Sequence, residues 1–440
     1  MSGPKTERPA NGWMKHCPAR DYCFDAGRGT YWIKNQAETW IMLNETQFKR
    51  ELRQGNVSPT VPNNSYVSPL DEVLLGIQHN FDVHYAGVLA GYAAGIHKMG
   101  ERRILVTESP RIIKPEHGDW PTLHTVINGL FADDADEKFD QPRYLYGWLK
   151  TAYEALRSGE PRPGQTLAVA GPHDIGKSLF QNLITHILGG RSARPYQFMT
   201  GLTSFNSDLF EAEHLMIEDD QASTDIRARR NFGAHLKNIT ANDWQRCHAK
   251  RRIPISLRPF WRLSISVNDE PENLMVLPPI DDSIQDKLIL LRAAQFPMPM
   301  PTATLAQRKA FWKTLEGELP AFIHFLIQWK IPRELKSDRF GIAHFHHPEI
   351  LQAIDALAPE SKLLSLIEHY FESLGDTRWE GPAEELERKL NGSDCQYEAR
   401  KLFSFNNACG VYLGRLAKKY PKRFSQHRTS KERRWTILCP

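Results

Sequence analysis

Cysteine is scarce in this sequence, a strong net charge is absent, and no long apolar run occurs. The six cysteines are scattered among 440 residues, which argues against a disulfide scaffold and indicates reduced thiols in a cytosolic protein. No apolar stretch is long enough for a membrane span or a signal peptide, so we expect a cytoplasmic protein without a membrane partner. The net charge of +4 is too small to indicate a nucleic-acid partner by itself. Only local clusters of basic residues can indicate one.

A phosphate-binding loop is the most specific motif in the chain. Residues 171–178 read GPHDIGKS, a full match to G-x-x-x-x-G-K-[ST], between a short apolar run suited to a strand and a segment with apolar residues at helical spacing. Strand, glycine loop and helix together aim backbone N–H groups at phosphate oxygens. We therefore predict bound ATP, with Lys177 on the β- and γ-phosphates and the Ser178 hydroxyl on Mg²⁺. The residues expected to contact the nucleotide are Gly171, Pro172, His173, Asp174, Ile175, Gly176, Lys177, Ser178 and Leu179.

Two later strands are expected to complete an ATPase site. Residues 213–220 read EHLMIEDD, a buried strand that ends in adjacent carboxylates. ATP hydrolysis needs one acid that holds Mg²⁺ and a neighbour that polarises the attacking water. We assign Glu218 to the metal and Asp219 to the water, with Asp220 as the alternative. Residues 260–269 predict a further core strand that ends in polar residues. Of these, Asn268 would lie beside the γ-phosphate and hold the water.

The segment between these two strands is strongly basic. Residues 227–262 hold ten Lys or Arg side chains and one acid, Asp243. Within it, residues 244–255 predict a strand, a basic tip and a return strand. Two interpretations are open, a solvated basic face or a surface that contacts nucleic-acid phosphates without regard to sequence.

The series GPHDIGKS, LMIEDD, basic hairpin and SVND resembles superfamily 3 helicases, and within them the D5-like helicases of phages, plasmids and other mobile elements. The resemblance covers residues 165–295, and more loosely a segment upstream. It implies an AAA+-like α/β P-loop ATPase that forms hexameric rings and translocates on DNA. It also implies that the hairpin projects into the central channel and grips the strand. The residues assigned to this contact are Arg246, His248, Lys250, Arg251 and Arg252.

One position departs from the pattern of the family. Ring ATPases complete their site with an arginine from the next subunit, which lies after the Asn motif in this family. This chain has Lys287 where an arginine often stands, and Arg292 follows five residues later. Lysine keeps the charge but loses the bidentate fork, so both the residue that acts between subunits and the rate of hydrolysis stay open.

The C-terminal segment, from residue 359, predicts three helices at 361–371, 381–390 and 407–420, followed by two short strands. This order is typical of a winged helix. Residues 411–440 hold nine Lys or Arg side chains and one acid, Glu432, so DNA binding and protein contact are both open. The residues assigned to DNA are Arg415, Lys418 and Lys419 on the third helix and Arg428, Lys431, Arg433 and Arg434 on the wing.

Composition and turn signals divide the chain into several parts. Residues 30–43 predict a hairpin and 44–54 a helix, while the Ala- and Gly-rich run 83–98 predicts closely packed helices. The expected parts are 1–68, a small α+β region; 69–160, a mainly helical domain for a collar or oligomerisation; 161–300, the AAA+-like ATPase core; 301–358, a helical lid or linker that covers the nucleotide or packs on the ring; and 359–440, the winged-helix-like domain.

Together these features predict an ATP- and Mg²⁺-dependent DNA helicase, a ring that pulls single-stranded or forked DNA during replication of a mobile element. A separate primase, polymerase or initiator would then be its partner, because no priming or nicking domain is evident. Two alternatives stay open: an ATPase switch that assembles on DNA without unwinding it, and a DNA-binding regulator whose nucleotide site is structural.

Overall fold

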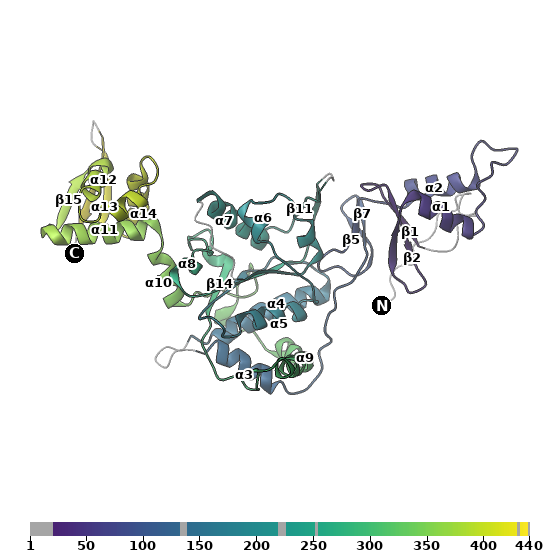
Figure 1. The fold of residues 1–440 in the computed structure, drawn as a ribbon, viewed down its shortest axis with the longest axis horizontal. Coiled ribbons are helices and arrows are strands. Elements are labelled where there is room, and N and C mark those ends of the chain that lie inside the picture. The colour runs from purple at the N-terminus through teal and green to yellow at the C-terminus, as the bar shows by residue number, and fades with distance from the viewer. Residues whose placement is uncertain (1–20, 133–138, 219–225, 251–253, 429–431, 439–440) are drawn as a thin grey trace.

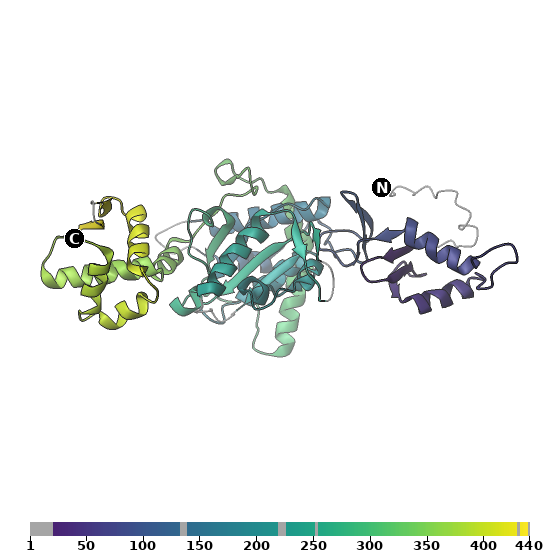
Figure 2. The same cartoon turned by 90° about the horizontal axis from the view of Figure 1, so that it is seen from above.

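The computed structural model describes residues 21–132, 139–218, 226–250, 254–428 and 432–438. They form three units in a row, with a central α/β unit between an N-terminal and a C-terminal unit (Figures 1 and 2). Among the described helices, none is long and apolar enough to cross a membrane.

The N-terminal unit is a four-stranded sheet in the order β3-β2-β1-β4, covered by two helices. The predicted hairpin and helix are confirmed, and Asn44 caps the helix through reciprocal bonds with Gln47, 2.8 and 2.9 Å long. The predicted boundary at residue 68 is wrong, because the next helix packs its apolar face into the same core. The elements are β1 (Tyr22–Asp25), β2 (Thr30–Lys34), β3 (Trp40–Leu43), α1 (Glu45–Gln54), α2 (Pro69–Asn80) and β4 (Asp82–Val83).

The Ala- and Gly-rich run after this unit forms strands, so the predicted packed helices at 83–98 are wrong. A three-stranded sheet in the order β5-β7-β6 follows β4 directly. Its glycines serve turns and close approaches to neighbouring segments: Gly91 has φ +84, and a Cβ there would lie 2.4 Å from the Cβ of Phe260. The strands are β5 (Tyr85–Gly87), β6 (Gly95–Met99) and β7 (Arg102–Val106).

A parallel five-stranded sheet forms the centre of the molecule, in the order β14-β8-β13-β10-β9. Its inner strands β8 and β13 are buried on both faces, as expected for a parallel sheet covered by helices. The strand that precedes Asn268 therefore lies between the strand of the phosphate loop and the strand that ends in Glu218. The strands are β8 (Thr166–Ala170), β9 (Ser192–Ala193), β10 (His214–Glu218), β13 (Arg262–Val267) and β14 (Leu288–Arg292).

Helices cover both faces of this sheet (Figure 1). Leu167 and Val169 of β8 face a core with α3, α4, α5 and α9, while Ala168 and Ala170 face a core with α6, α7, α8 and α10. The bounds of the helices are α3 (Pro121–Leu130), α4 (Gln141–Ser158), α5 (Lys177–Ile187), α6 (Tyr196–Thr200), α7 (Ile226–Ala241), α8 (Pro271–Leu274), α9 (Leu305–Gln328) and α10 (Pro348–Ala356), with short 3₁₀ turns η2 (Ser207–Glu211), η3 (Gln285–Lys287) and η4 (Arg333–Leu335).

Two further predicted boundaries are wrong for the same reason. Helices α3 and α4 were assigned to a separate helical domain, yet they share one core with the P-loop helix α5, and the indole of Trp148 donates to the carbonyl of Gln165 at 2.8 Å. Helix α9 was assigned to a lid or to packing on the ring. It buries Phe311, Leu315 and Phe322 against this same core and is therefore part of the central unit.

The C-terminal unit has its own core. The three predicted helices and the hairpin are present, but the sequence interpretation missed a short helix, α13, and a strand, β15, that completes an antiparallel sheet in the order β15-β17-β16. The elements are α11 (Pro359–Leu374), β15 (Arg378–Gly381), α12 (Ala383–Asn391), α13 (Gln396–Leu402), α14 (Ala408–Lys419), β16 (Phe424–Arg428) and β17 (Arg433–Leu438).

Candidate nucleotide site and nucleic-acid interface

The phosphate loop joins the carboxyl end of β8 to the N-terminus of α5, as the motif predicts. Two of its positions accept only glycine. Gly176 has φ +99, and a Cβ on Gly171 would lie 2.3 Å from the carbonyl oxygen of Ala293. The loop therefore keeps its backbone close to the end of β14, and Ser178, in the first turn of α5, is exposed.

Lys177 is buried and fully engaged within the chain. Its ammonium donates to the carbonyls of Gly171 and Pro172 at 2.8 and 2.5 Å and to Oδ1 of Asn268 at 2.9 Å. The last bond joins two residues that the sequence analysis selected from separate motifs. Because the ammonium holds three oxygen acceptors, phosphate oxygens could replace them without leaving the charge unpaired.

Glu218 stands on the same sheet edge as Asn268. It pairs in register with Ser266 of β13, so β10 and β13 present both side chains at their carboxyl ends, where ligands of parallel sheets bind. Its carboxylate forms an ion pair with Arg194, 2.5 Å between Oε2 and Nη2. Sequence reasoning missed Arg194, since nothing marks a single arginine after a two-residue strand. Asp219 and Asp220 lie outside the described residues.

A contact between an imidazole and a carboxylate joins the phosphate loop to the segment after Asn268. His173 Nε2 lies 2.7 Å from Oε1 of Glu270. A hydrogen bond from Asn273 is the main reason that the pKa of Glu270 is lowered, and His173 lowers it further. The carboxylate is thus charged and available to hold the loop, a contact that the sequence did not indicate.

Beneath the loop, a buried polar network seats α5 on the sheet. His214 of β10 contacts the hydroxyl of Thr185 through Nδ1 at 2.7 Å and that of Ser264 through Nε2 at 2.8 Å, and the Gln181 amide donates to Ser264 at 2.7 Å. Burial, and then the nearby charge of Arg194, lower the pKa of His214 to about 3. The imidazole is therefore neutral at physiological pH, as a fully buried ring should be.

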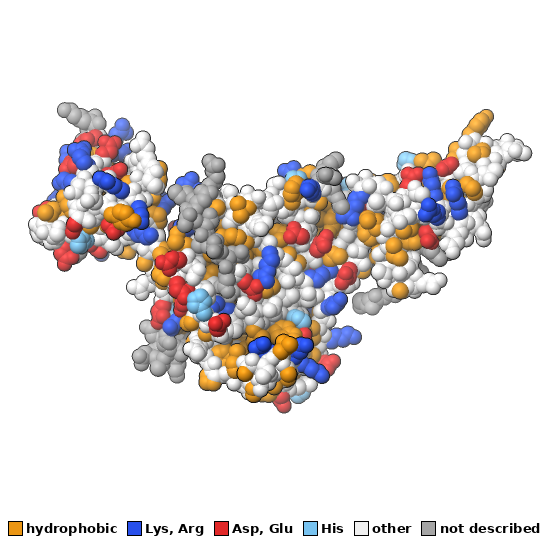
Figure 3. All heavy atoms as spheres, in the orientation of Figure 1, with side chains coloured by type: hydrophobic (Ala, Val, Ile, Leu, Met, Phe, Trp, Pro, Cys, Tyr) orange, Lys and Arg blue, Asp and Glu red, His pale blue; other side chains and the backbone are white. Residues whose placement is uncertain are grey.

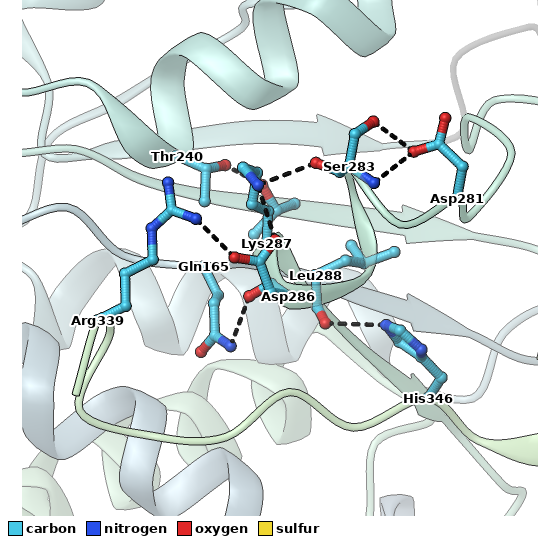
Figure 4. Close-up of polar contacts among 10 residues, drawn as sticks. Gln165, Thr240, Asp281, Ser283, Asp286, Lys287, Leu288, Arg339 and His346 are labelled. Atoms are coloured by element: carbon cyan, nitrogen blue, oxygen red, sulfur yellow. Dashed lines mark hydrogen bonds and ion pairs between the residues drawn. The ribbon is translucent and has the colours of Figure 1, made fainter. Parts of the chain in front are cut away.

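The predicted role of Lys287 between subunits is not supported by its position. Its ammonium donates to the carbonyl of Ser283 at 2.9 Å and to Oδ1 of Asp286 at 2.7 Å, and its side chain is 12% exposed (Figure 4). Arg339 holds the other carboxylate oxygen at 2.6 Å. Burial by itself raises the pKa of Asp286, but Lys287 and Arg339 together lower it below its usual value. Lys287 thus belongs to an internal cluster.

The predicted basic hairpin is present, built from strands β11 (Gln245–Cys247) and β12 (Ile255–Leu257). Asn206 fixes its base: its Oδ1 accepts from the His248 N–H at 2.7 Å and its amide donates to the Arg246 carbonyl at 3.0 Å. Lys250 and the side chain of Arg246 are exposed, whereas Arg251 and Arg252 lie outside the described residues. Sequence reasoning missed Asn206, because its partners are backbone groups far along the chain.

A cavity of about 320 Å³ adjoins the hairpin. The ring of Phe205 packs on His248 with centroids 5.0 Å apart, and Phe205 and Trp244 are 41% and 55% exposed. Exposed rings beside a basic tip can stack on unpaired bases. The cavity is lined by Phe198, Ser204, Asn206, His235, Asn238, Gln245, Arg246, His248 and Pro254.

The basic residues of the C-terminal unit are divided in their contacts. Arg415 pairs with Glu360 at 3.0 Å, and Lys419 pairs with Asp355 of α10 at 2.8 Å, so both bind acids of the chain itself. Lys418, Arg428 and Arg433 are exposed, and Arg434 pairs with Glu432 at 3.6 Å. Lys431 lies outside the described residues. On the face drawn in Figure 3, Lys and Arg side chains alternate with acidic ones instead of forming one continuous stripe.

Residues 169–283 match a family described as "Family of unknown function (DUF5906)", about a quarter of the chain. No curated protein matches the sequence. Among solved structures, the apo NrS-1 C-terminal region (305–718) is similar over 96% of each chain, with a TM-score of 0.56 and 13% identity. This chain therefore shares its mixed α/β fold.

A structure described as "SCCmec type IV Cch - active helicase" covers 92% of this chain and 73% of its own, with 9% identity, but its TM-score is 0.34. JCV helicase with a bound small molecule covers 56% of this chain and 70% of its own, at 13% identity and a TM-score of 0.23. Both scores lie below the level that indicates a shared overall fold.

Proposed function

We propose that this chain is a DNA-dependent ATPase of the superfamily 3 type, with an AAA+-like core. The observation that carries the proposal is the contact between Lys177 and Asn268, 2.9 Å, on a sheet whose next strand ends in Glu218. A cation, an amide and a carboxylate at one edge of a parallel sheet, around a glycine loop at a helix N-terminus, form a constellation suited to phosphoryl transfer.

The residues present suit ATP and Mg²⁺. Gly171 and Gly176 allow the backbone approach that phosphates need, and Lys177 already holds oxygen acceptors. Ser178, in the first turn of α5, and Glu218 would hold the metal. Mg²⁺ held there would supply positive charge that offsets the charge of the phosphates.

The chain's own groups then have distinct tasks. Lys177 exchanges its two carbonyl partners for phosphate oxygens, and the amide of Asn268 orients the water and reports the presence of the γ-phosphate. Glu218 must leave Arg194 before it can serve a metal, because a cation at 2.5 Å competes for the carboxylate. Asp219 keeps its proposed role of polarising the water.

The proposal for DNA rests on the hairpin. Its base is fixed by Asn206, its tip presents Lys250, and aromatic rings flank it. We propose that this hairpin contacts single-stranded or forked DNA in a homo-oligomeric ring, a hexamer, and that the C-terminal unit acts as a winged helix. Replication of a mobile element, with a separate primase, polymerase or initiator, would be the setting.

A second candidate is an ATPase switch that assembles on DNA without unwinding it. Three observations favour it. Lys177 donates to a carbonyl of its own loop, Glu218 is paired with Arg194, and Lys287 bonds to a carbonyl of its own chain. Such a site would turn over slowly until a partner rearranges it. A DNA-binding regulator with a purely structural nucleotide is the third possibility.

ATP hydrolysis with and without single-stranded DNA separates these functions. A DNA-stimulated rate that is abolished in Lys250→Ala and kept in Lys309→Ala, which removes an exposed lysine of α9, supports the translocase. A rate of ATP hydrolysis that changes neither with DNA nor in Lys250→Ala would favour the ATPase switch over the translocase. No hydrolysis, or a rate unchanged by Lys177→Ala, overturns the ATPase proposal and leaves the regulator.

A further inference from the structure

Three side chains with different donor atoms converge on the surface of the C-terminal unit. His369 comes from α11, while Asp394 and Cys395 come from the turn between α12 and α13. His369 Nε2 lies 2.9 Å from Oδ2 of Asp394, and Cys395 Sγ lies 3.6 Å from Oδ1. One ligand atom from each residue lies within 4.8 Å of the other two, and of the described residues only these three form such a group.

The turn that supplies two of the donors is rigidly held. The Ser393 hydroxyl donates to the carbonyl of Leu390 at 2.8 Å and accepts from the N–H of Cys395 at 3.1 Å. Cys395 is 7% exposed and begins α13. His369 and Asp394 are open to solvent, with side chains 60% and 65% exposed. The group therefore combines a fixed inner donor with outer donors that an ion can reach.

The contacts and charges around the group favour a cation. Asp394 accepts from both the imidazole and the thiol, so one carboxylate links the other two donors. The charges that act on His369 and Cys395 from outside the group are the acids Glu372 and Glu398, which attract a cation.

We propose that His369, Asp394 and Cys395 bind one Zn²⁺ ion and tie α11 to the α12–α13 turn. Nitrogen, oxygen and sulfur donors are the set that Zn²⁺ accepts, and three protein ligands leave a fourth position for water. On binding, the Cys395 thiol loses its proton to solvent, and His369 binds the ion as a neutral imidazole that keeps its proton on the other ring nitrogen. This proposal is independent of the ATPase.

The test is Zn²⁺ titration of the full chain against a chromogenic chelator, with Co²⁺ as a spectroscopic probe. Wild type should bind one ion per chain, and its Co²⁺ form should show a thiolate-to-metal charge-transfer band. His369→Asn and Asp394→Asn, both at exposed positions, should each weaken binding by about 100-fold and remove the band. His427→Asn removes another exposed histidine of the same unit, paired with Glu380 at 3.4 Å, and should bind as wild type does.

Zinc should also raise the unfolding temperature of wild type and of His427→Asn but not that of His369→Asn. Equal affinity in His369→Asn and wild type, or a Co²⁺ spectrum without the thiolate band, would place any bound ion elsewhere and overturn the proposal.

Discussion

The candidate nucleotide site is predicted from motifs of fixed spacing, whereas the DNA contacts of the C-terminal unit are predicted from a count of charged side chains, and the contacts in the structure differ accordingly. At the nucleotide site, Lys177 and Asn268, chosen from separate motifs, bond to each other directly. In the C-terminal unit, two of the basic residues assigned to DNA, Arg415 and Lys419, bond to acids of α11 and α10.

The contrast reflects what each pattern specifies. A phosphate loop needs glycine where the backbone turns left-handed or meets Ala293, so its spacing encodes a three-dimensional shape. A count of lysines and arginines encodes no geometry, and acids distant in sequence can take up the charge. Positions that geometry constrains are therefore predictable from sequence, while a charge count only names candidates.

The largest expected effect is at Lys177. Lys177→Ala should reduce ATP hydrolysis by at least about 100-fold, because the positive charge that would stabilise the transferring phosphoryl group is gone. Steady-state ATPase assays measure it. Lys150→Ala is the matched control, since Lys150 also donates to two carbonyls, those of Leu326 and Ile327, in the same unit. Comparable loss in both variants would show that structural damage, and not phosphate binding, causes the effect.

Much of the central unit was predictable, and the failures have physical reasons. The loop, the strands before Glu218 and Asn268 and the basic hairpin were found because local pattern specifies them. Domain boundaries failed, because α4 and α9 bury apolar residues whose partners are set by tertiary packing. The glycines at 83–98 favour packed helices by composition alone, but positive φ values such as that of Gly91 belong to turns. Arg194, Glu270 and Asn206 gave no signal, since each acts through contacts with groups distant along the chain.

The buried network under the loop should make the central unit acid-sensitive. The pKa of His214 is about 3 when folded and about 6.5 when unfolded, so the unfolded state binds the proton more readily. The neutral His214 therefore contributes fully to the free energy of unfolding above pH 6.5, and this contribution is lost as the pH falls toward 3. By pH 5 the loss amounts to about 2 kcal/mol.

Urea unfolding at pH 7.5 and pH 5 measures this contribution. His214→Gln keeps a polar side chain between Thr185 and Ser264 but cannot titrate, so its stability should fall less with acid than that of wild type. His427→Gln, at an exposed histidine, serves as the control. Equal pH dependence in His214→Gln and wild type would mean that other groups control acid unfolding.

A smaller effect is expected at Arg194. Arg194→Ala removes the cation that competes with Mg²⁺ for Glu218, so half-maximal hydrolysis should need about 3- to 10-fold less Mg²⁺, as a partly exposed pair allows. Mg²⁺ titrations of ATPase rate measure it. Arg162→Ala is the control, since Arg162 forms an exposed pair with Glu160 outside the site. An unchanged or higher Mg²⁺ requirement would assign Arg194 another role.

The smallest effects are expected for substitutions of basic residues on α14 of the C-terminal unit. Lys418 and Arg415 lie one turn apart on α14, but only Arg415 pairs with Glu360, and its guanidinium lies 5.8 Å from the ring of Tyr412. Lys418→Ala should weaken DNA binding and reduce its salt dependence by about one counterion.

Arg415→Ala should leave the salt dependence unchanged and lower the stability of the unit by up to about 1 kcal/mol, the range of an exposed ion pair. Fluorescence anisotropy at several salt concentrations and urea unfolding separate the two outcomes. The reverse result would show that Arg415 releases Glu360 to bind phosphate, and the internal ion pair would then be a resting state of a DNA-binding surface.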